Sequence, residues 1–224
     1  MKKDYASEMV TAFIKLNGAT VGAVANRSKI YDEEGNVAGE LDDKLTANGC
    51  EKAAEFIGFC DSFSIPVLTL TNVTGFCATS KCCEKRLAKA TAKLVYAYTN
   101  ATVPKVNLVM QNAYGSAYVA MGSKSLGTDI VYAWPTAKIA MMDAKSAVQI
   151  MYADEIASSD DVTSVINEKT AEYTEIQSSV NAAAAHGYVD SIIEPKDTRK
   201  YLIGAFEMLF TKREERPMKK HGTV

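Results

Sequence analysis

Short runs of β-branched and other apolar residues alternate along the chain with longer segments whose apolar residues recur at helical spacing. Runs of the first kind are typical of buried strands, and segments of the second kind are typical of helices. We predict strands at residues 9–16, 20–25, 66–70, 106–110, 129–133, 138–142 and 189–193. We predict helices at residues 46–63, 82–99, 117–121, 144–152, 180–186 and 197–211. This alternation indicates an α/β fold in which helices pack against a sheet.

The connections carry signals of their own. Asn17 and Gly18 separate the first two strands, and this dipeptide strongly favours a tight hairpin turn. Residues 28–42 are polar and contain glycine, so we predict a loop there, and we predict a second loop at residues 75–80. Residues 158–174 are charged and weakly periodic, which predicts a helical hairpin or a lid.

The stretch 111–124 combines a strand end, a turn and a helix start. An apolar, β-rich run at residues 106–110 precedes it, and small residues and helix formers come after the turn. Gly115 supplies the tolerance of positive φ that a sharp turn requires. The first N–H groups of the helix, at Ser116 and Ala117, have no acceptor inside the helix and can hold a developing negative oxygen. On the turn alone, an ordinary connection between a strand and a helix is the favoured interpretation.

Composition excludes several classes of protein. With 224 residues, of which 47% are hydrophobic and 23% charged, the chain can bury one substantial core. A net charge of −2 gives no positive field for nucleic acid, so we predict no nucleic-acid partner. No apolar run approaches the roughly 20 residues of a membrane helix, and the start has no apolar segment typical of a secretory signal. We therefore expect a cytoplasmic location.

The five cysteines favour reduced thiols over disulfides, because an odd number in such a chain argues against a disulfide framework. Cys77, Cys82 and Cys83 are clustered in the sequence. A zinc site would need a second pair of ligands at suitable spacing, and the two histidines, His186 and His221, do not supply one. We predict no metal site.

The stretch 111–124 resembles the Ala-Tyr-Gly-Gly-Ala-Tyr motif of biotin-dependent acyl-CoA carboxyltransferases. This family includes the β-subunits of propionyl- and acetyl-CoA carboxylases and the α-subunits of methylmalonyl- and glutaconyl-CoA decarboxylases. Other segments keep the resemblance in register over nearly the whole chain: 16–18, 21–26, 53–56, 59–61, 65–67, 75–76, 92–98, 101–106, 121–124, 133–137, 187–190, 193–195, 211–217 and 219–222. The resemblance implies a crotonase-like fold of repeated ββα units. It further implies a single domain, residues 1–224, that corresponds to the C-terminal half of the usual fused polypeptide.

The resemblance also implies a reaction. The family moves a carboxyl group between carboxybiotin, carried on a partner protein, and the α-carbon of an acyl-CoA, without a metal or a protein nucleophile. The biotin-side oxyanion hole falls on the backbone amides of Ser116 and Ala117. The positions implied to bind biotin or substrate are Gly75, Phe76, Tyr114, Gly115, Tyr118 and Val119. Val119 stands where propionyl-type relatives often carry an acidic residue, which favours an apolar acyl pocket.

The thioester-side oxyanion hole of the family belongs to the other half of the polypeptide. The partners implied are therefore an N-terminal-type carboxyltransferase subunit and a biotin carrier protein. We expect the chain to be inactive alone, and we expect it to form a homo-oligomer when that partner is absent, because a lone half would expose a large apolar face.

Several glycines of the family motif are replaced in this chain, by Lys85, Arg86, Ser116, Asp143 and Ser146. Glycine lets a backbone approach a ligand closely, so these replacements should crowd or rearrange the biotin slot. Two hypotheses result. The chain is a catalytic subunit with a rebuilt pocket, or it is a non-catalytic structural paralogue in the same assembly. The cations of this region, which include Lys81, either contact a CoA phosphate or form a solvated face.

Overall fold

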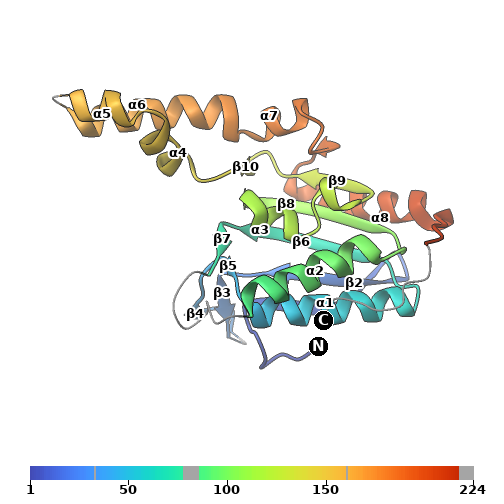
Figure 1. Cartoon of the computed structure of the whole chain (residues 1–224). Helices are drawn as coiled ribbons and strands as arrows, with labels where there is room; N and C mark the ends of the chain where they lie inside the picture. Colours follow the sequence, from blue (N-terminus) through green and yellow to red (C-terminus); the bar gives the residue numbers. More distant parts are fainter. Residues whose placement is uncertain (33, 78–85, 160, 217–224) are drawn as a thin grey trace.

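A seven-stranded sheet forms the centre of the computed structural model, which describes residues 1–32, 34–77, 86–159 and 161–216. The strand order is β1-β2-β6-β8-β9-β11, and β10 pairs with the end of β8 (Figure 1). β1 is antiparallel to β2, and the other neighbouring strands are parallel. The strands are β1 (Met9–Leu16), β2 (Ala19–Asn26), β6 (Val67–Val73), β8 (Lys105–Tyr114), β9 (Ile130–Ala133), β10 (Lys138–Ala140) and β11 (Ser191–Ile192).

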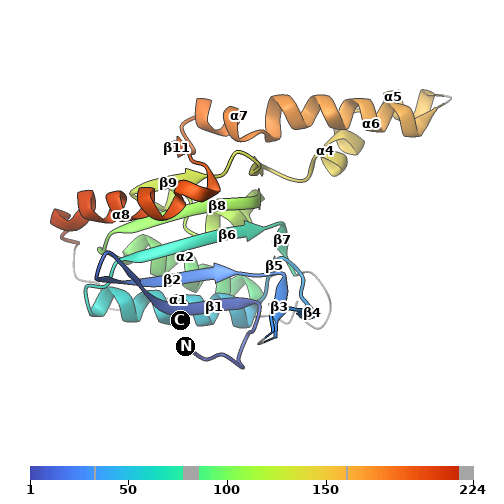
Figure 2. The same ribbon diagram turned by 180° about the vertical axis from the view of Figure 1, so that it is seen from behind.

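Helices cover both faces of this sheet. α1 (Ala47–Ser62) and α2 (Leu87–Asn100) lie on one face, and α8 (Thr198–Met208) lies on the other (Figures 1 and 2). Strands buried on both faces read as nearly continuous apolar runs, which is why the parallel strands were predictable. The predicted helix start at Thr46 is confirmed, since its side-chain oxygen accepts a hydrogen bond from the Gly49 amide at 3.0 Å. The short helices that complete the chain are η1 (Lys124–Leu126), η3 (Pro195–Asp197) and η4 (Leu209–Thr211).

The predicted hairpin between β1 and β2 is confirmed. Leu16 pairs with Ala19 across the turn, and Asn17 and Gly18 take φ values of 47° and 82°. Positive φ at both central residues is the geometry that an Asn-Gly hairpin turn requires.

The prediction of a loop at residues 28–42 is wrong, because this segment forms a hairpin of β3 (Lys29–Tyr31) and β4 (Val37–Glu40). The Asp32 side chain closes the turn by accepting hydrogen bonds from the amides of Glu34 at 3.0 Å and Asn36 at 2.8 Å. Such an Asx turn lets polar residues form a hairpin without an apolar pattern.

The predicted loop at residues 75–80 is also partly wrong. β7 (Gly75–Phe76) forms a short parallel pair with β5 (Lys44–Leu45), while residues 78–80 lie outside the described residues. The helix predicted to start at residue 82 is described from Leu87 onward, where α2 begins. The predicted end of a strand at residue 110 is too early, since β8 continues to Tyr114.

An arm of helices projects from the body of the molecule (Figures 1 and 2). It consists of α4 (Ala144–Met151), α5 (Ala153–Ser158) and α6 (Val162–Tyr173), and it ends in a π-helical turn, η2 (Thr174–Ser178). α7 (Val180–Ala185) then leads the chain back to the core. The predicted range 158–174 contains one helix, α6, which contacts α4 and α5, so the helical content is confirmed whereas a hairpin within this range is not. Within the described ranges, no helix is long and apolar enough to cross a bilayer.

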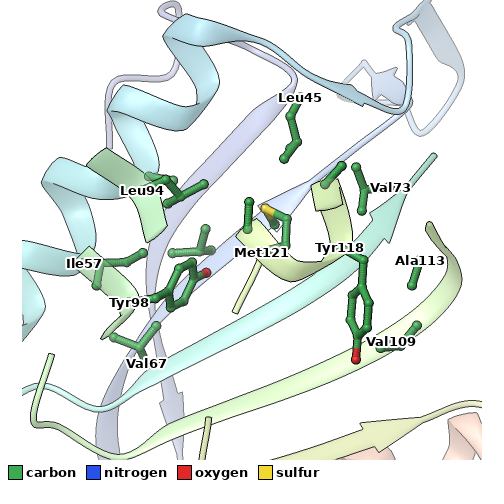
Figure 3. Packing of buried hydrophobic residues seen from close by; sticks show 14 of the residues in the cluster. Leu45, Ile57, Val67, Val73, Leu94, Tyr98, Val109, Ala113, Tyr118 and Met121 are labelled. Atoms are coloured by element: carbon green, nitrogen blue, oxygen red, sulfur yellow. The ribbon is translucent and has the colours of Figure 1, made fainter. Parts of the chain in front are cut away.

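A buried polar network fixes the chain just after α3 (Gly115–Ala120). The Asn107 side chain donates hydrogen bonds to the carbonyl oxygens of Met121 at 3.1 Å and Gly122 at 2.6 Å. Gly122 has a φ of +74°, and a Cβ atom there would lie 2.7 Å from the Tyr98 ring. Figure 3 shows Tyr98 and Met121 in this part of the core. Position 122 therefore requires glycine for both its backbone conformation and the space it leaves.

We expect Gly122→Ala to destabilise the protein. The left-handed backbone costs a residue with a Cβ about 1–2 kcal/mol, and overpacking against Tyr98 costs about 1–3 kcal/mol more. Urea unfolding measures the loss. Gly58→Ala is the matched control, because Gly58 lies in α1 with open space around its Cβ position and should gain about 0.5–1 kcal/mol. Equal stability of Gly122→Ala and the wild type would contradict this account of the core.

Candidate functional site

The turn from β8 into α3 is built on Gly115. Its φ is +57°, which confirms the predicted positive value, and a Cβ atom there would lie 2.8 Å from the carbonyl oxygen of Met141. No side chain larger than hydrogen fits this position without moving the backbone of the residue directly after β10. Sequence reasoning missed Met141, and no signal marks it, because the contact is made by its main chain.

The amides of Ser116 and Ala117 belong to the first turn of α3, so they have no acceptor within that helix. Ser116 is exposed, whereas Ala117 is buried with its methyl group in the core. The turn lies at the carboxyl ends of the parallel strands, which is where open α/β sheets bind ligands. A pair of free N–H groups in this place is suited to a small anionic oxygen.

Gly75 and Phe76 lie close to this turn although they are about 40 residues away in the sequence, because β7 packs against α3. A Cβ atom at Gly75 would meet nothing within 4 Å, so a ligand can approach the backbone there. Phe76 is partly buried against the main core. The structure thus brings together two segments that the resemblance implied separately.

Tyr118 lies beneath the turn rather than on its surface. Only 7% of the residue is exposed, and its ring lies beside Val109 and Ala113 of β8 (Figure 3). Its hydroxyl has no hydrogen-bond partner among the described residues, and burial raises the pKa of Tyr118 to about 12. Val119 is partly buried. Of these two predicted binding residues, Val119 is the one with exposed surface next to the turn.

Tyr114 is partly buried, and polar groups surround its side chain. Its hydroxyl donates a hydrogen bond to Oδ1 of Asn112 at 3.2 Å. Burial raises the pKa of the Tyr114 phenol, and the nearby carboxylates of Asp143 and Asp43 raise it further. Asp43 itself is held by the Thr74 hydroxyl, which donates to its carboxylate at 2.6 Å. Tyr114 is therefore a neutral donor at the rim of the site, next to two negative charges.

Two of the residues that replace family glycines, Asp143 and Ser146, form a helix N-cap together. The Asp143 carboxylate accepts a hydrogen bond from the Ser146 amide at 3.1 Å and so caps the start of α4. Hydrogen bonds from Ser146 hold the pKa of Asp143 below its usual value. The first turn of α4 is thus already satisfied by a carboxylate of the chain itself.

The structure describes only some of the cationic residues and cysteines that the sequence analysis singled out. Arg86 forms an ion pair with Glu51 of α1, with 2.6 Å between Nη2 and Oε2, whereas Lys81 and Lys85 lie outside the described residues. The predicted contact with a CoA phosphate stays a prediction. Cys50, Cys60 and Cys77 are buried and form no disulfide with one another, and Cys82 and Cys83 are not among the residues described. No cluster of His, Cys, Asp and Glu in the described part of the chain has the arrangement of a metal site.

A separate cavity of about 860 Å³ lies at the other end of the sheet. It is lined by the starts of β6 and β8 and by the end of α8, including Pro66, Pro104, Phe206 and Phe210. None of the predicted site residues lines it. The candidate site is therefore not built around this cavity.

The fold and the turn together define a class. The parallel sheet with its ββα connections is a crotonase-like fold, as the resemblance implied. Residues 1–224 match the carboxyl transferase domain. The chain belongs to this carboxyl transferase family.

Named relatives agree with this assignment. The methylmalonyl-CoA carboxyltransferase 12S subunit of Propionibacterium freudenreichii subsp. shermanii is 43% identical over 222 residues, which cover 99% of this chain and 40% of the relative. The methylmalonyl-CoA decarboxylase subunit alpha of Propionigenium modestum is 42% identical over 220 residues, covering 98% of this chain and 41% of the relative. The chain thus spans about two fifths of the length of these relatives.

Solved structures also match. The transcarboxylase 12S crystal structure, described as a hexamer assembly with methylmalonyl-coenzyme A and methylmalonic acid bound, superposes with a TM-score of 0.89 at 43% identity. That match covers 99% of this chain and 41% of the other. The β subunit of P. aeruginosa geranyl-CoA carboxylase gives a TM-score of 0.77 at 25% identity, covering 99% of this chain and 40% of that one.

The cap on α4 leads to a testable prediction. We expect Asp143→Ala to lose about 1 kcal/mol of stability at pH 7, the usual cost of removing a helix cap. Because the folded-state pKa of Asp143 is depressed, its contribution is present above its ordinary pKa of 3.8 and is lost as the pH falls through the folded value. Urea unfolding at several pH values measures the difference from the wild type. Asp143→Asn keeps an oxygen cap and should retain most of the stability, and an unaffected Asp143→Ala would disprove the cap.

Proposed function

We propose that residues 1–224 form one C-terminal-type carboxyltransferase domain that supplies the biotin-side part of a carboxyl transfer site. The activity is transfer of a carboxyl group between carboxybiotin, held on a biotin carrier protein, and an acyl-CoA, in the carboxylase or the decarboxylase direction. The observation that carries this proposal is the pair of first-turn amides at Ser116 and Ala117, which come directly after a glycine turn at the carboxyl end of the interior strand β8. Family membership and the names of the relatives support it.

The chain's own groups fit the proposed chemistry. Bound biotin would supply the ureido group that carries the carboxyl group. The Ser116 and Ala117 amides would donate hydrogen bonds to its ureido oxygen, and because they are part of a folded turn they would need little reorganisation. Gly75 leaves room for a ligand to approach its backbone closely, and Tyr114 contributes a neutral hydroxyl. No described side chain near the turn has to act as a nucleophile.

Completion of the site requires a second region. We propose that an N-terminal-type carboxyltransferase subunit supplies the thioester-side oxyanion hole, because this chain spans about two fifths of the length of its relatives. The arm offers a surface for such a partner, since several of its large apolar side chains are exposed: Ile150, Met151, Val162 and Ile176. Met141 and Met142, just before the arm, are exposed as well. A contiguous apolar surface is typical of an interface. The cytoplasmic location expected from the sequence stays a prediction.

A specific observation favours the second hypothesis, a non-catalytic paralogue. The Asp143 carboxylate already occupies the start of α4, and Asp143 and Asp43 place negative charge near Tyr114. Negative charge beside an oxyanion hole weakens its attraction for a developing anion. A subunit with this arrangement can keep the fold and the assembly while another subunit performs the chemistry.

Removal of one amide tests the proposed role directly. Ala117→Pro deletes an N–H in the first helical turn, where proline is tolerated. We expect carboxyl transfer by the reconstituted complex to fall by about 10²–10³-fold, the usual effect of losing one oxyanion-hole donor. Circular dichroism first establishes that the variant is folded. An amide-to-ester replacement at Ala117 removes the same N–H without adding a ring, and it should show the same loss.

Two controls accompany this measurement. The wild-type chain without the N-terminal-type subunit should show no transfer to any acyl-CoA. A reconstituted complex in which folded Ala117→Pro transfers carboxyl groups at the wild-type rate would remove the Ser116 and Ala117 assignment. A wild-type complex that assembles but shows no transfer would favour the non-catalytic hypothesis.

Assembly gives an independent prediction. We expect the purified chain to form a dimer or a larger homo-oligomer, and to form a hetero-oligomer when the N-terminal-type subunit is added, because the exposed apolar residues of the arm need cover. Light scattering at micromolar concentration measures the mass. Ile150→Lys, a change at a residue that is 68% exposed, should shift the equilibrium towards the monomer without unfolding the chain. A stable wild-type monomer that ignores the added subunit would show that the assembly proposal is wrong.

A further inference from the structure

Strand β8 leaves its regular pairing with β6 shortly before the turn into α3. The regular pairing stops after Val109 and resumes at Ala113. On β6, the single residue Asn72 spans the same interval, so residues 110–112 form a bulge on β8. Bulges bend a strand and redirect the residues beyond the bend, and they are frequent beside active sites.

The Asn72 side chain closes the gap that the bulge leaves. Its Oδ1 atom accepts a hydrogen bond from the Asn112 amide at 3.1 Å, in place of the missing main-chain bond between the strands. Asn26 of β2 holds the Asn72 main chain on both sides: the Asn72 amide donates to Asn26 Oδ1 at 2.9 Å, and Asn26 Nδ2 donates to the Asn72 carbonyl oxygen. Asn112 in turn accepts the Tyr114 hydroxyl at 3.2 Å.

This chain of hydrogen bonds runs from β2 through β6 to the end of β8. Asn26 is 6% exposed, so the chain starts inside the protein, and it ends at Tyr114, the residue directly before the glycine turn. Linked hydrogen bonds of partly buried amides restrict one another, so the loss of one member loosens the others. β8 pairs with β10 at residues 112–114, so the same short segment also fixes the register with β10.

We propose that Asn72 is a positioning residue for the proposed carboxyl transfer. Through the Asn112 amide it fixes the end of β8, and it thereby sets the direction in which the Ser116 and Ala117 N–H groups point. Asn72 itself contacts neither group that the proposed reaction uses. The expected effect of Asn72 on the reaction rate rests on the proposed function. The expected effect of Asn72 on the structure of the turn rests on the hydrogen bonds alone.

Three variants test the inference. Asn72→Ala removes the acceptor for the Asn112 amide. Asn72→Asp keeps an oxygen in the same place and so should rescue the turn. Thr69→Val is the matched control, because it removes a buried hydrogen bond on the same strand, between the Thr69 hydroxyl and the Tyr98 hydroxyl at 2.9 Å, which does not touch the turn.

Two measurements are made on each variant: hydrogen exchange of the peptides that contain residues 110–117 in the free chain, and the kinetics of the reconstituted complex. For Asn72→Ala we expect faster exchange in this segment and a fall in kcat of about 10–100-fold, as a slightly misplaced group causes, with KM for the acyl-CoA within about twofold. Asn72→Asp should resemble the wild type in both measurements. Thr69→Val should lower the melting temperature and leave both unchanged.

Each outcome decides the inference. The inference is wrong if Asn72→Ala exchanges hydrogen at the wild-type rate in residues 110–117 and keeps the wild-type kcat. It is also wrong if a folded Asn72→Asp variant behaves like Asn72→Ala. An equal fall in kcat for Thr69→Val would show a general effect of lost stability and would overturn it too. If the wild-type complex shows no transfer, the proposed function fails, and the exchange data alone then decide whether Asn72 holds the turn.

Discussion

The contact between Gly115 and the Met141 carbonyl oxygen is the constraint on which the candidate site depends. The main chain must turn with a φ of +57° while another segment passes so close that a Cβ atom would lie 2.8 Å from its oxygen. Only glycine satisfies both conditions at once. Because the turn is this tight, α3 begins directly after the end of β8. β10 pairs with the last three residues of β8, beside the turn. This packing therefore fixes where α3 begins, and with it the position of the Ser116 and Ala117 amides.

The sequence predicted those parts of the fold that bury apolar surface. The parallel strands, the Asn17-Gly18 hairpin, the cap at Thr46 and the helices α1, α4, α7 and α8 agree with their predicted positions to within a few residues. Two of the failures share a physical cause, because polar groups stabilise the structure at both places. Asp32 closes the β3–β4 hairpin with side-chain hydrogen bonds, and the last part of β8 contains Asn112 rather than an apolar residue.

The candidate site could be predicted only in part for the same reason. The glycine turn and the helix start are local in sequence, so the residues from Tyr114 to Ala117 were identifiable. Contacts such as those of Asn72 with Asn112 or Met141 with Gly115 join residues far apart in the chain, and in both a main-chain atom is a partner. A contact made by a main-chain atom does not depend on which side chain the residue carries, so it cannot be predicted from the residue type. The replacement of glycines by Asp143 and Ser146 was visible in the sequence, but their pairing as a helix cap was not.

The position of Met141 links the base of the arm to the turn. Met141 lies directly after β10 and shortly before α4, in one of the two connections between the arm and the body. Its carbonyl oxygen is the atom that leaves no room for a Cβ atom at position 115. Because protein interiors are closely packed, one contact thus holds both the base of the arm and the glycine turn.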